Sequence, residues 1–138
     1  METINHEYYV SLEVAKLLKE AGFDWEYNRY YEFDGKLVWT YFENWNDVMW
    51  SRHSTAIYSA PSLEVAQRWL REVKGIHMCV KADAASINCK YFVTVIISDT
   101  KWGNVQDENM KTILFSTYEE AQEAGVQKCL TILLNESK

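Results

Sequence analysis

The pentapeptide Ser11-Leu12-Glu13-Val14-Ala15 returns unchanged at Ser62-Leu63-Glu64-Val65-Ala66. Each copy opens a run of apolar residues at the 3.6-residue period of a helix, and each run stops at a glycine, Gly22 or Gly75. Serine is a preferred residue at the start of a helix, and glycine is preferred just past its end. The repeat therefore predicts two capped helices, residues 12–21 and 63–74, that lie against extended segments.

The chain between these helices is rich in aromatic residues and predicts a β-hairpin. Tyr27 to Phe33 and Leu37 to Phe42 are strand-like, and they flank Asp34-Gly35, a signal for a two-residue hairpin turn. Alternation fades after this hairpin. Residues 43–55 are expected to form a loop or a short, irregular third strand.

The second half of the chain predicts further strands and a third helix. In order, we expect a half-buried strand, a central strand that is apolar on both faces, a polar loop and a last strand: Ile76–Lys81, Tyr91–Ser98, Asp99–Glu108 and Met110–Phe115. Ser116 and Glu119 then form a capping box for a helix that runs to about Leu134. Gly125 inside this helix costs about 1 kcal/mol relative to alanine, which indicates a close neighbour.

These elements predict an α+β fold in the order α-β-β-(β)-α-β-β-β-α. Short connections between successive strands favour a mostly antiparallel sheet of about five strands, with the three helices mainly on one face. The length of 138 residues, the 48% hydrophobic content and the 25% charged content are typical of one folded domain, residues 1–138. The repeated pentapeptide is explained equally well by duplication of an α-β-β unit and by a shared solution to helix capping.

Charge and cysteine content narrow the classes of partner and the compartment. A net charge of −6 disfavours nucleic acid and anionic membranes, because both require a basic surface. Three cysteines without a CxxC spacing indicate reduced thiols. Residues 1–9 lack the apolar segment of a secretory signal, and no apolar run approaches the length of a membrane span. We therefore expect a cytoplasmic protein.

Three stretches carry a resemblance to a known family: Tyr9 to Trp25, Ala60 to Ile76 and Tyr118 to Gly125, the last reading Tyr-Glu-Glu-Ala-Gln-Glu-Ala-Gly. They resemble an uncharacterised family of small prophage and mobile-element proteins from Bacteroides-type gut anaerobes. The resemblance spans nearly the whole chain and is strongest on the three helices. It implies a cytosolic, phage-associated origin and transfers no catalytic or binding residue.

Candidate catalytic and metal-binding residues lack the surroundings that their chemistry needs. His53 lies between two serines and six residues after Asp47, but no nucleophile-elbow motif accompanies it. His77 and Cys79 alternate on one strand face without a second clustered pair of ligands. Carboxylates among the aromatic residues show no spacing that singles out a glycosidase pair. We expect no catalytic residue, no metal and no cofactor, and an enzyme is disfavoured without being excluded.

The most suggestive feature is the block of aromatic residues from Trp25 to Tyr58, which holds eleven of the twenty in the chain. Strand alternation places Trp39 and Tyr41 on one face, so one side of the sheet can keep its rings outside. Exposed Trp and Tyr are enriched at protein interfaces. The predicted interaction surface consists of Tyr27, Tyr31, Trp39, Tyr41, Trp45 and Trp50.

Three functions remain open on the sequence. The favoured one is a non-enzymatic protein-interaction module whose aromatic hairpin binds an unknown protein partner or a second copy, with Leu37–Phe42 as the edge strand of a homodimer. The first alternative is a module that binds a peptide, sugar or base on the same rings. The second alternative is a small hydrolase around His53.

Overall fold

The structure is a computed structural model, and it describes residues 8–47, 56–85 and 88–136. It confirms the α+β class and the predicted order α-β-β-β-α-β-β-β-α. The elements are α1 (Leu12–Ala21), β1 (Tyr27–Glu32), β2 (Leu37–Glu43), β3 (Ile57–Ser59), α2 (Leu63–Lys74), β4 (His77–Asp83), β5 (Lys90–Ser98), β6 (Lys101–Asn104) and α3 (Tyr118–Glu136).

Both copies of the pentapeptide form capped helices, as predicted. The Ser11 hydroxyl accepts a hydrogen bond from the Val14 amide, and the hydroxyl of Ser62 does the same at the second copy. Gly22 and Gly75 end the two helices in the left-handed conformation, with φ of 97° and 70°. The sequence and the structure therefore agree at all four ends.

The chain segments that precede these two helices pair with each other. The Val10 amide donates to the Pro61 carbonyl at 3.0 Å, and the Leu63 amide donates to the Tyr8 carbonyl at 2.8 Å. Val10 and Pro61 occupy the same position in the two copies, one residue before the capping serine. The two helix starts therefore lie side by side, which both the duplication and the shared-capping interpretations allow.

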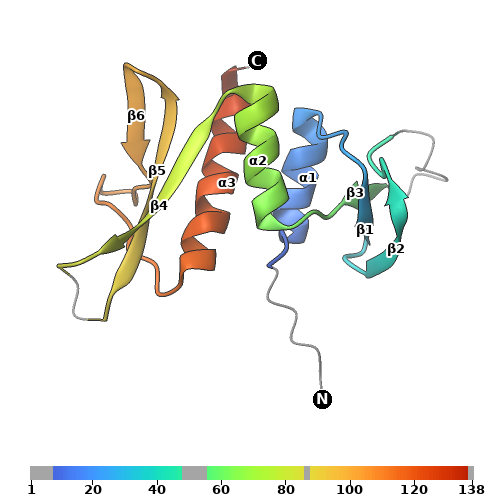
Figure 1. Ribbon diagram of the computed structural model, residues 1–138, viewed down its shortest axis with the longest axis horizontal. Helices are drawn as coiled ribbons and strands as arrows, with labels where there is room; N and C mark the ends of the chain where they lie inside the picture. The colour runs from blue at the N-terminus through green and yellow to red at the C-terminus, as the bar shows by residue number, and fades with distance from the viewer. Residues whose placement is uncertain (1–7, 48–55, 86–87, 137–138) are drawn as a thin grey trace.

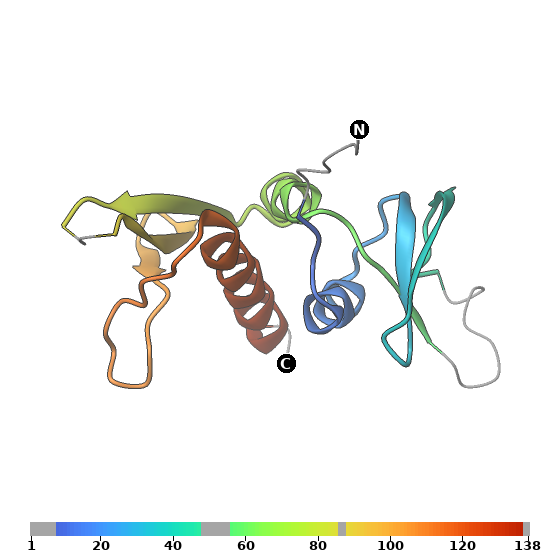
Figure 2. The same cartoon turned by 90° about the horizontal axis from the view of Figure 1, so that it is seen from below.

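The six strands form two antiparallel three-stranded sheets, where the sequence predicted one sheet of about five strands. The order is β2-β1-β3 in the first sheet and β4-β5-β6 in the second, with β5 central as expected. The three helices lie between the sheets and cover one face of each (Figures 1 and 2). Each sheet is built from strands that follow one another along the chain: β1, β2 and β3 come before α2, and β4, β5 and β6 come after it.

The last strand of the second sheet is β6, and this corrects the prediction of a strand at Met110–Phe115. Asp107 explains the difference, because its carboxylate accepts from the amides of Asn109 and Lys111 and closes a tight turn. Met110 adopts a φ of 63° in that turn. Only isolated bridges, among them Tyr91 with Phe115, remain of the expected strand.

The starts of α3 and of the first hairpin also differ in detail from the prediction. Thr117 caps α3 in place of Ser116, since its hydroxyl accepts from the Glu120 amide at 3.1 Å. In the hairpin, the Gly35 amide donates to the Glu32 carbonyl, and the Glu32 amide donates to the Lys36 carbonyl. Gly35 has a φ of 91°, so the turn is a three-residue loop with a glycine bulge.

The core lies among the helices and against the inner face of the second sheet. Trp69 of α2 is fully buried, and its ring meets that of Phe23 at a centroid distance of 5.4 Å. Gly125 brings α3 close to the sheet: a Cβ at this position would lie 2.6 Å from Met78 Cε and 2.7 Å from Val93 Cγ2. The close neighbour that the sequence indicated at Gly125 is therefore a pair of side chains from β4 and β5.

Candidate interaction surface

The outer side of β2 is an edge that no other strand of the described residues pairs with. Strand β2 is the last strand of its sheet and pairs with β1. The hydrogen bond from the Glu32 amide to Lys36, together with the antiparallel register, places the next hydrogen-bonded pair at Tyr30 and Val38. The backbone N–H and C=O groups of Leu37 and Trp39 therefore point away from β1.

Three large rings lie exposed along this edge. They are Trp39, Tyr41 and Phe42, with exposed fractions of 52%, 59% and 62%. We call this set the aromatic edge. Exposed rings on an unpaired strand combine two features that strand-adding interfaces use, namely free backbone groups and apolar side-chain anchors.

The structure places the six predicted surface rings in different environments. Trp39 and Tyr41 are exposed. Tyr31 is half-buried, and its hydroxyl donates to the Val10 carbonyl at 2.9 Å. Trp50 lies outside the described residues. Of the predicted rings, Trp39 and Tyr41 therefore remain as exposed surface, and Phe42 is a further exposed ring that was not predicted.

Tyr27 and Trp45 are buried, which corrects their assignment to the surface. The indole N–H of Trp45 donates to the Tyr27 carbonyl at 2.7 Å. The Trp45 ring also meets the ring of Tyr30 at 4.9 Å between centroids. A satisfied indole N–H and a ring partner allow a tryptophan to lie inside, so these two residues support the sheet from within.

Trp39 and Tyr41 lie on opposite faces of the sheet, although strand alternation predicts that they share one. Trp39 contacts the Arg29 guanidinium, while Tyr41 packs on Trp45, which in turn packs on Tyr30. Arg29 and Tyr30 are adjacent in β1 and point to opposite sides. The pairing of β1 with β2 is irregular at this point: between the pairs Arg29–Trp39 and Tyr27–Glu43, β1 advances by two residues and β2 by four. The extra residues of β2, among them Tyr41, do not follow simple alternation.

A buried arginine holds the inner ring of the aromatic edge. Arg29 is 5% exposed, and its guanidinium carbon lies 3.9 Å from the centroid of the Tyr9 ring, 5.3 Å from Trp39 and 5.6 Å from Tyr31. Its Nη1 donates to the Ala60 carbonyl at 3.1 Å. Cation–π contacts of this kind are strongest where water is excluded. This contact and an edge-on contact with the Tyr9 ring, 5.4 Å between centroids, favour the observed position of the Trp39 ring.

No carboxylate of the described residues forms an ion pair with Arg29, and its Nε has no hydrogen-bond partner. Burial lowers the pKa of Arg29, and the hydroxyls of Tyr31 and Tyr9 oppose that shift. An arginine nevertheless stays charged, because its ordinary pKa lies above 12. Arg29 is not among the residues that the sequence predicted for the surface or for any site. The sequence holds one signal for it: Arg29 lies between Tyr27 and Tyr31 in the alternation of β1, at a position that points inward with them.

The alternative chemistries find little support in the described part of the chain. Asp47 is exposed, whereas His53 and the serines beside it lie outside the described residues. Across residues 8–47, 56–85 and 88–136, no group of three or more histidine, cysteine or acidic side chains could hold a metal ion. His77 and Cys79 lie exposed on one face of β4 and gain no third ligand there. No described helix is long and apolar enough to span a bilayer.

Comparisons with protein-family models, with curated proteins and with solved structures find no match to this chain.

Proposed function

We propose that the protein is a non-enzymatic interaction module that binds an extended segment of a protein partner at the aromatic edge. The observation that carries this proposal is the position of Trp39, Tyr41 and Phe42 on a strand whose outer side pairs with no other described strand. A partner strand would bond to the outward backbone groups of Leu37 and Trp39 and cover the rings on both faces of the sheet.

A second copy of this chain fits the edge by charge. Lys36 lies just before β2 and Glu43 ends it, while the residues between them carry no charge. Antiparallel pairing of two β2 strands would bring Lys36 of one copy toward Glu43 of the other, with apolar and aromatic residues in the middle. Opposite charges at the two ends favour this orientation and oppose a parallel one.

The two alternative functions have weaker support. A ligand-stacking platform requires rings on one face, and Trp39 and Tyr41 lie on opposite faces. The hydrolase alternative centres on His53, outside the described residues, and stays a prediction. The prophage and mobile-element resemblance also stays a prediction, and we propose a cytoplasmic, phage-associated setting on its basis.

Hydrogen exchange of single backbone amides tests whether the edge is open. In dilute protein we expect the amides of Leu37 and Trp39 to exchange rapidly, because they point away from β1, while the Val38 amide in the β1–β2 ladder exchanges slowly. If Leu37 and Trp39 are as protected as Val38 in the monomer, another part of the chain already covers the edge, and the proposal is wrong.

Light scattering over a range of protein concentrations tests the second copy as partner. We expect dimers to form with rising concentration, together with protection of the Leu37 and Trp39 amides. Phe42→Lys should shift the equilibrium to monomers, because a charge on an edge strand opposes pairing. Trp102→Lys is the matched control: it replaces an exposed ring, 67% accessible, with the same charge on β6 of the other sheet. Equal effects of the two variants would contradict a role for the aromatic edge.

A further inference from the structure

A small apolar pocket lies at the other end of the molecule, between β6 and α3. Its volume is about 190 Å³. The apolar side chains of Val95 and Ile97 from β5 and of Ile132 from α3 line it. Lys101 and Lys128, which are both exposed, line it as well. An apolar hollow with a few polar groups at its mouth is typical of a small-molecule site.

The pocket exists because position 103 is a glycine. Gly103 pairs with Val95 across the β5–β6 ladder, so both residues face α3. A Cβ at Gly103 would meet no atom of the described residues within 4 Å, and the φ of Gly103 is not in the left-handed region. The backbone therefore does not require glycine here. This position differs from Gly125, where a Cβ would collide with two neighbours, so the absent side chain leaves room that other residues do not use.

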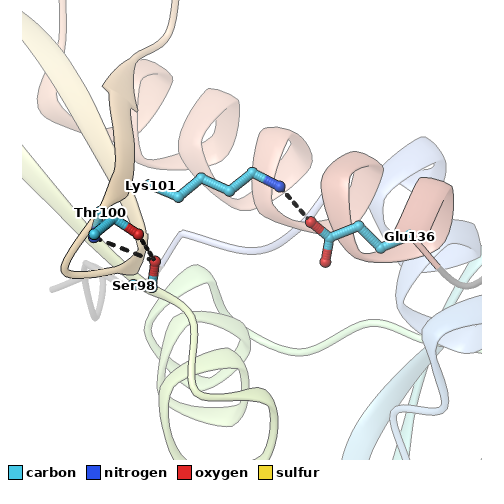
Figure 3. A network of polar contacts seen from close by, with 4 residues as sticks. All are labelled: Ser98, Thr100, Lys101 and Glu136. Atoms are coloured by element: carbon cyan, nitrogen blue, oxygen red, sulfur yellow. Dashed lines mark hydrogen bonds and ion pairs between the residues drawn. The ribbon is translucent and has the colours of Figure 1, made fainter.

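The mouth of the pocket carries positive charge on an acidic protein. Lys101 reaches across from β6 to α3, and its Nζ lies 2.6 Å from Oε1 of Glu136 (Figure 3). Both side chains are half exposed or more, so this ion pair adds little stability and opens readily. Lys128 forms no ion pair with a described residue. Two ammonium groups beside an apolar hollow attract anions despite the net charge of −6.

We propose that this pocket binds a small amphipathic anion: an aliphatic or aromatic carboxylate whose hydrocarbon part fills the space beside Gly103. Its carboxylate would bond to Lys128 and would take the place of the Glu136 carboxylate on Lys101. The hydrocarbon part gains from leaving water for the surface of Val95, Ile97 and Ile132. This site is separate from the aromatic edge, and the proposal does not depend on the interaction function.

Three eight-carbon probes, one with an anionic, one with a neutral and one with a cationic head group, test the chemical class. The full chain is titrated with sodium octanoate, 1-octanol and octylamine below their aggregation limits, and amide NMR shifts are followed. We expect octanoate to shift the amides of Gly103 and Ile132, 1-octanol to bind at least ten-fold more weakly, and octylamine not to bind. Equal binding of octanoate and 1-octanol, or no octanoate binding at millimolar concentration, overturns the proposal.

Variants that are expected to lower the affinity for octanoate, and one that is expected to raise it, locate the site. Gly103→Val should weaken octanoate binding at least ten-fold, because its side chain would occupy the hollow, where a Cβ meets no atom of the described residues within 4 Å. Lys128→Gln should weaken it several-fold, while Lys111→Gln, the charge-matched control on the distant turn at residues 107–111, should not. Glu136→Gln should strengthen it, because Lys101 is released from its partner. If Gly103→Val keeps full binding, or if Glu136→Gln weakens binding, the ligand does not lie in this pocket.

Discussion

Replacing Gly125 with alanine measures how firmly α3 is held against the second sheet. Alanine favours the helical state over glycine by about 1 kcal/mol. Against this gain, the new Cβ would lie 2.6 Å from Met78 Cε and 2.7 Å from Val93 Cγ2. Such distances force the neighbours to move, and adding a methyl group to a well-packed core costs about 1–3 kcal/mol.

The two neighbours differ in how easily they can move. Met78 Cε is the end of a flexible side chain and can rotate away at small cost. Val93 is fully buried and β-branched, and it lies in the central strand of its sheet, so its methyl group is fixed. Val93 therefore sets the cost of the Gly125→Ala change. We expect a net loss of about 1 kcal/mol in the free energy of unfolding.

A double-mutant cycle with Val93→Ala separates this clash from other effects. Urea unfolding followed by tryptophan fluorescence gives the free energy of unfolding for the four proteins. In the Val93→Ala background the clash with Cγ2 is gone, so Gly125→Ala should become neutral or stabilising, with a coupling energy of about 1 kcal/mol or more. Zero coupling, or stabilisation by Gly125→Ala alone, would refute the close approach of α3 to β5.

Further predictions concern two buried groups, the Cys129 thiol and the Arg29 guanidinium. Burial raises the pKa of Cys129 to about 12, so at pH 8 a thiol reagent should modify the exposed Cys79 and Cys89 and reach Cys129 only after denaturation; three fast thiols would contradict its burial. Because this folded pKa exceeds the ordinary 9.0, the contribution of the neutral thiol to the free energy of unfolding is complete below pH 9 and falls as the pH rises toward 12. Urea unfolding at pH 8 and pH 10, with Cys129→Ala as the control, measures this loss. Arg29→Lys should lower the free energy of unfolding by about 2 kcal/mol, because an ammonium cannot stack flat on three rings. Arg29→Met should cost less, since it removes a buried charge at similar volume; the reverse order of thermal midpoints would show that the charge itself is required.

The helices could be predicted well because their signals are local. Ser62 and Gly75 lie at the ends of one helix, and the hydrogen bonds that cap it connect residues a few positions apart. The same holds for Ser11 and Gly22. Such signals can be read without knowledge of the rest of the fold.

The strands were harder to place because polar side chains change the local geometry. Asp107 forms a turn through its carboxylate, and this turn interrupts the run of residues that suggested a strand at Met110–Phe115. The chain instead pairs earlier, at β6, within a segment whose polar residues suggested a loop. Polar composition alone does not separate a hairpin at the surface from a loop.

The aromatic edge could be predicted in part. The edge position of Leu37–Phe42 and the exposure of Trp39 follow from the hairpin signal and from alternation. The facing of Tyr41 does not, because a bulge breaks alternation within one strand. The setting of Arg29 could not be predicted either. It depends on Tyr9 from the segment before α1 and on the carbonyl of Ala60, which are far from Arg29 in sequence.

The helical layer between the two sheets makes the molecule two-ended. The outer edge of β2 and the outer strand β6 lie at opposite extremes of the longest axis (Figure 1), with α1, α2 and α3 between them. Occupants at the two ends could not touch each other, so both could be held at once without steric competition. Communication between them would have to travel as a displacement of packed helices, and tightly packed helices such as α3 at Gly125 leave little freedom for one.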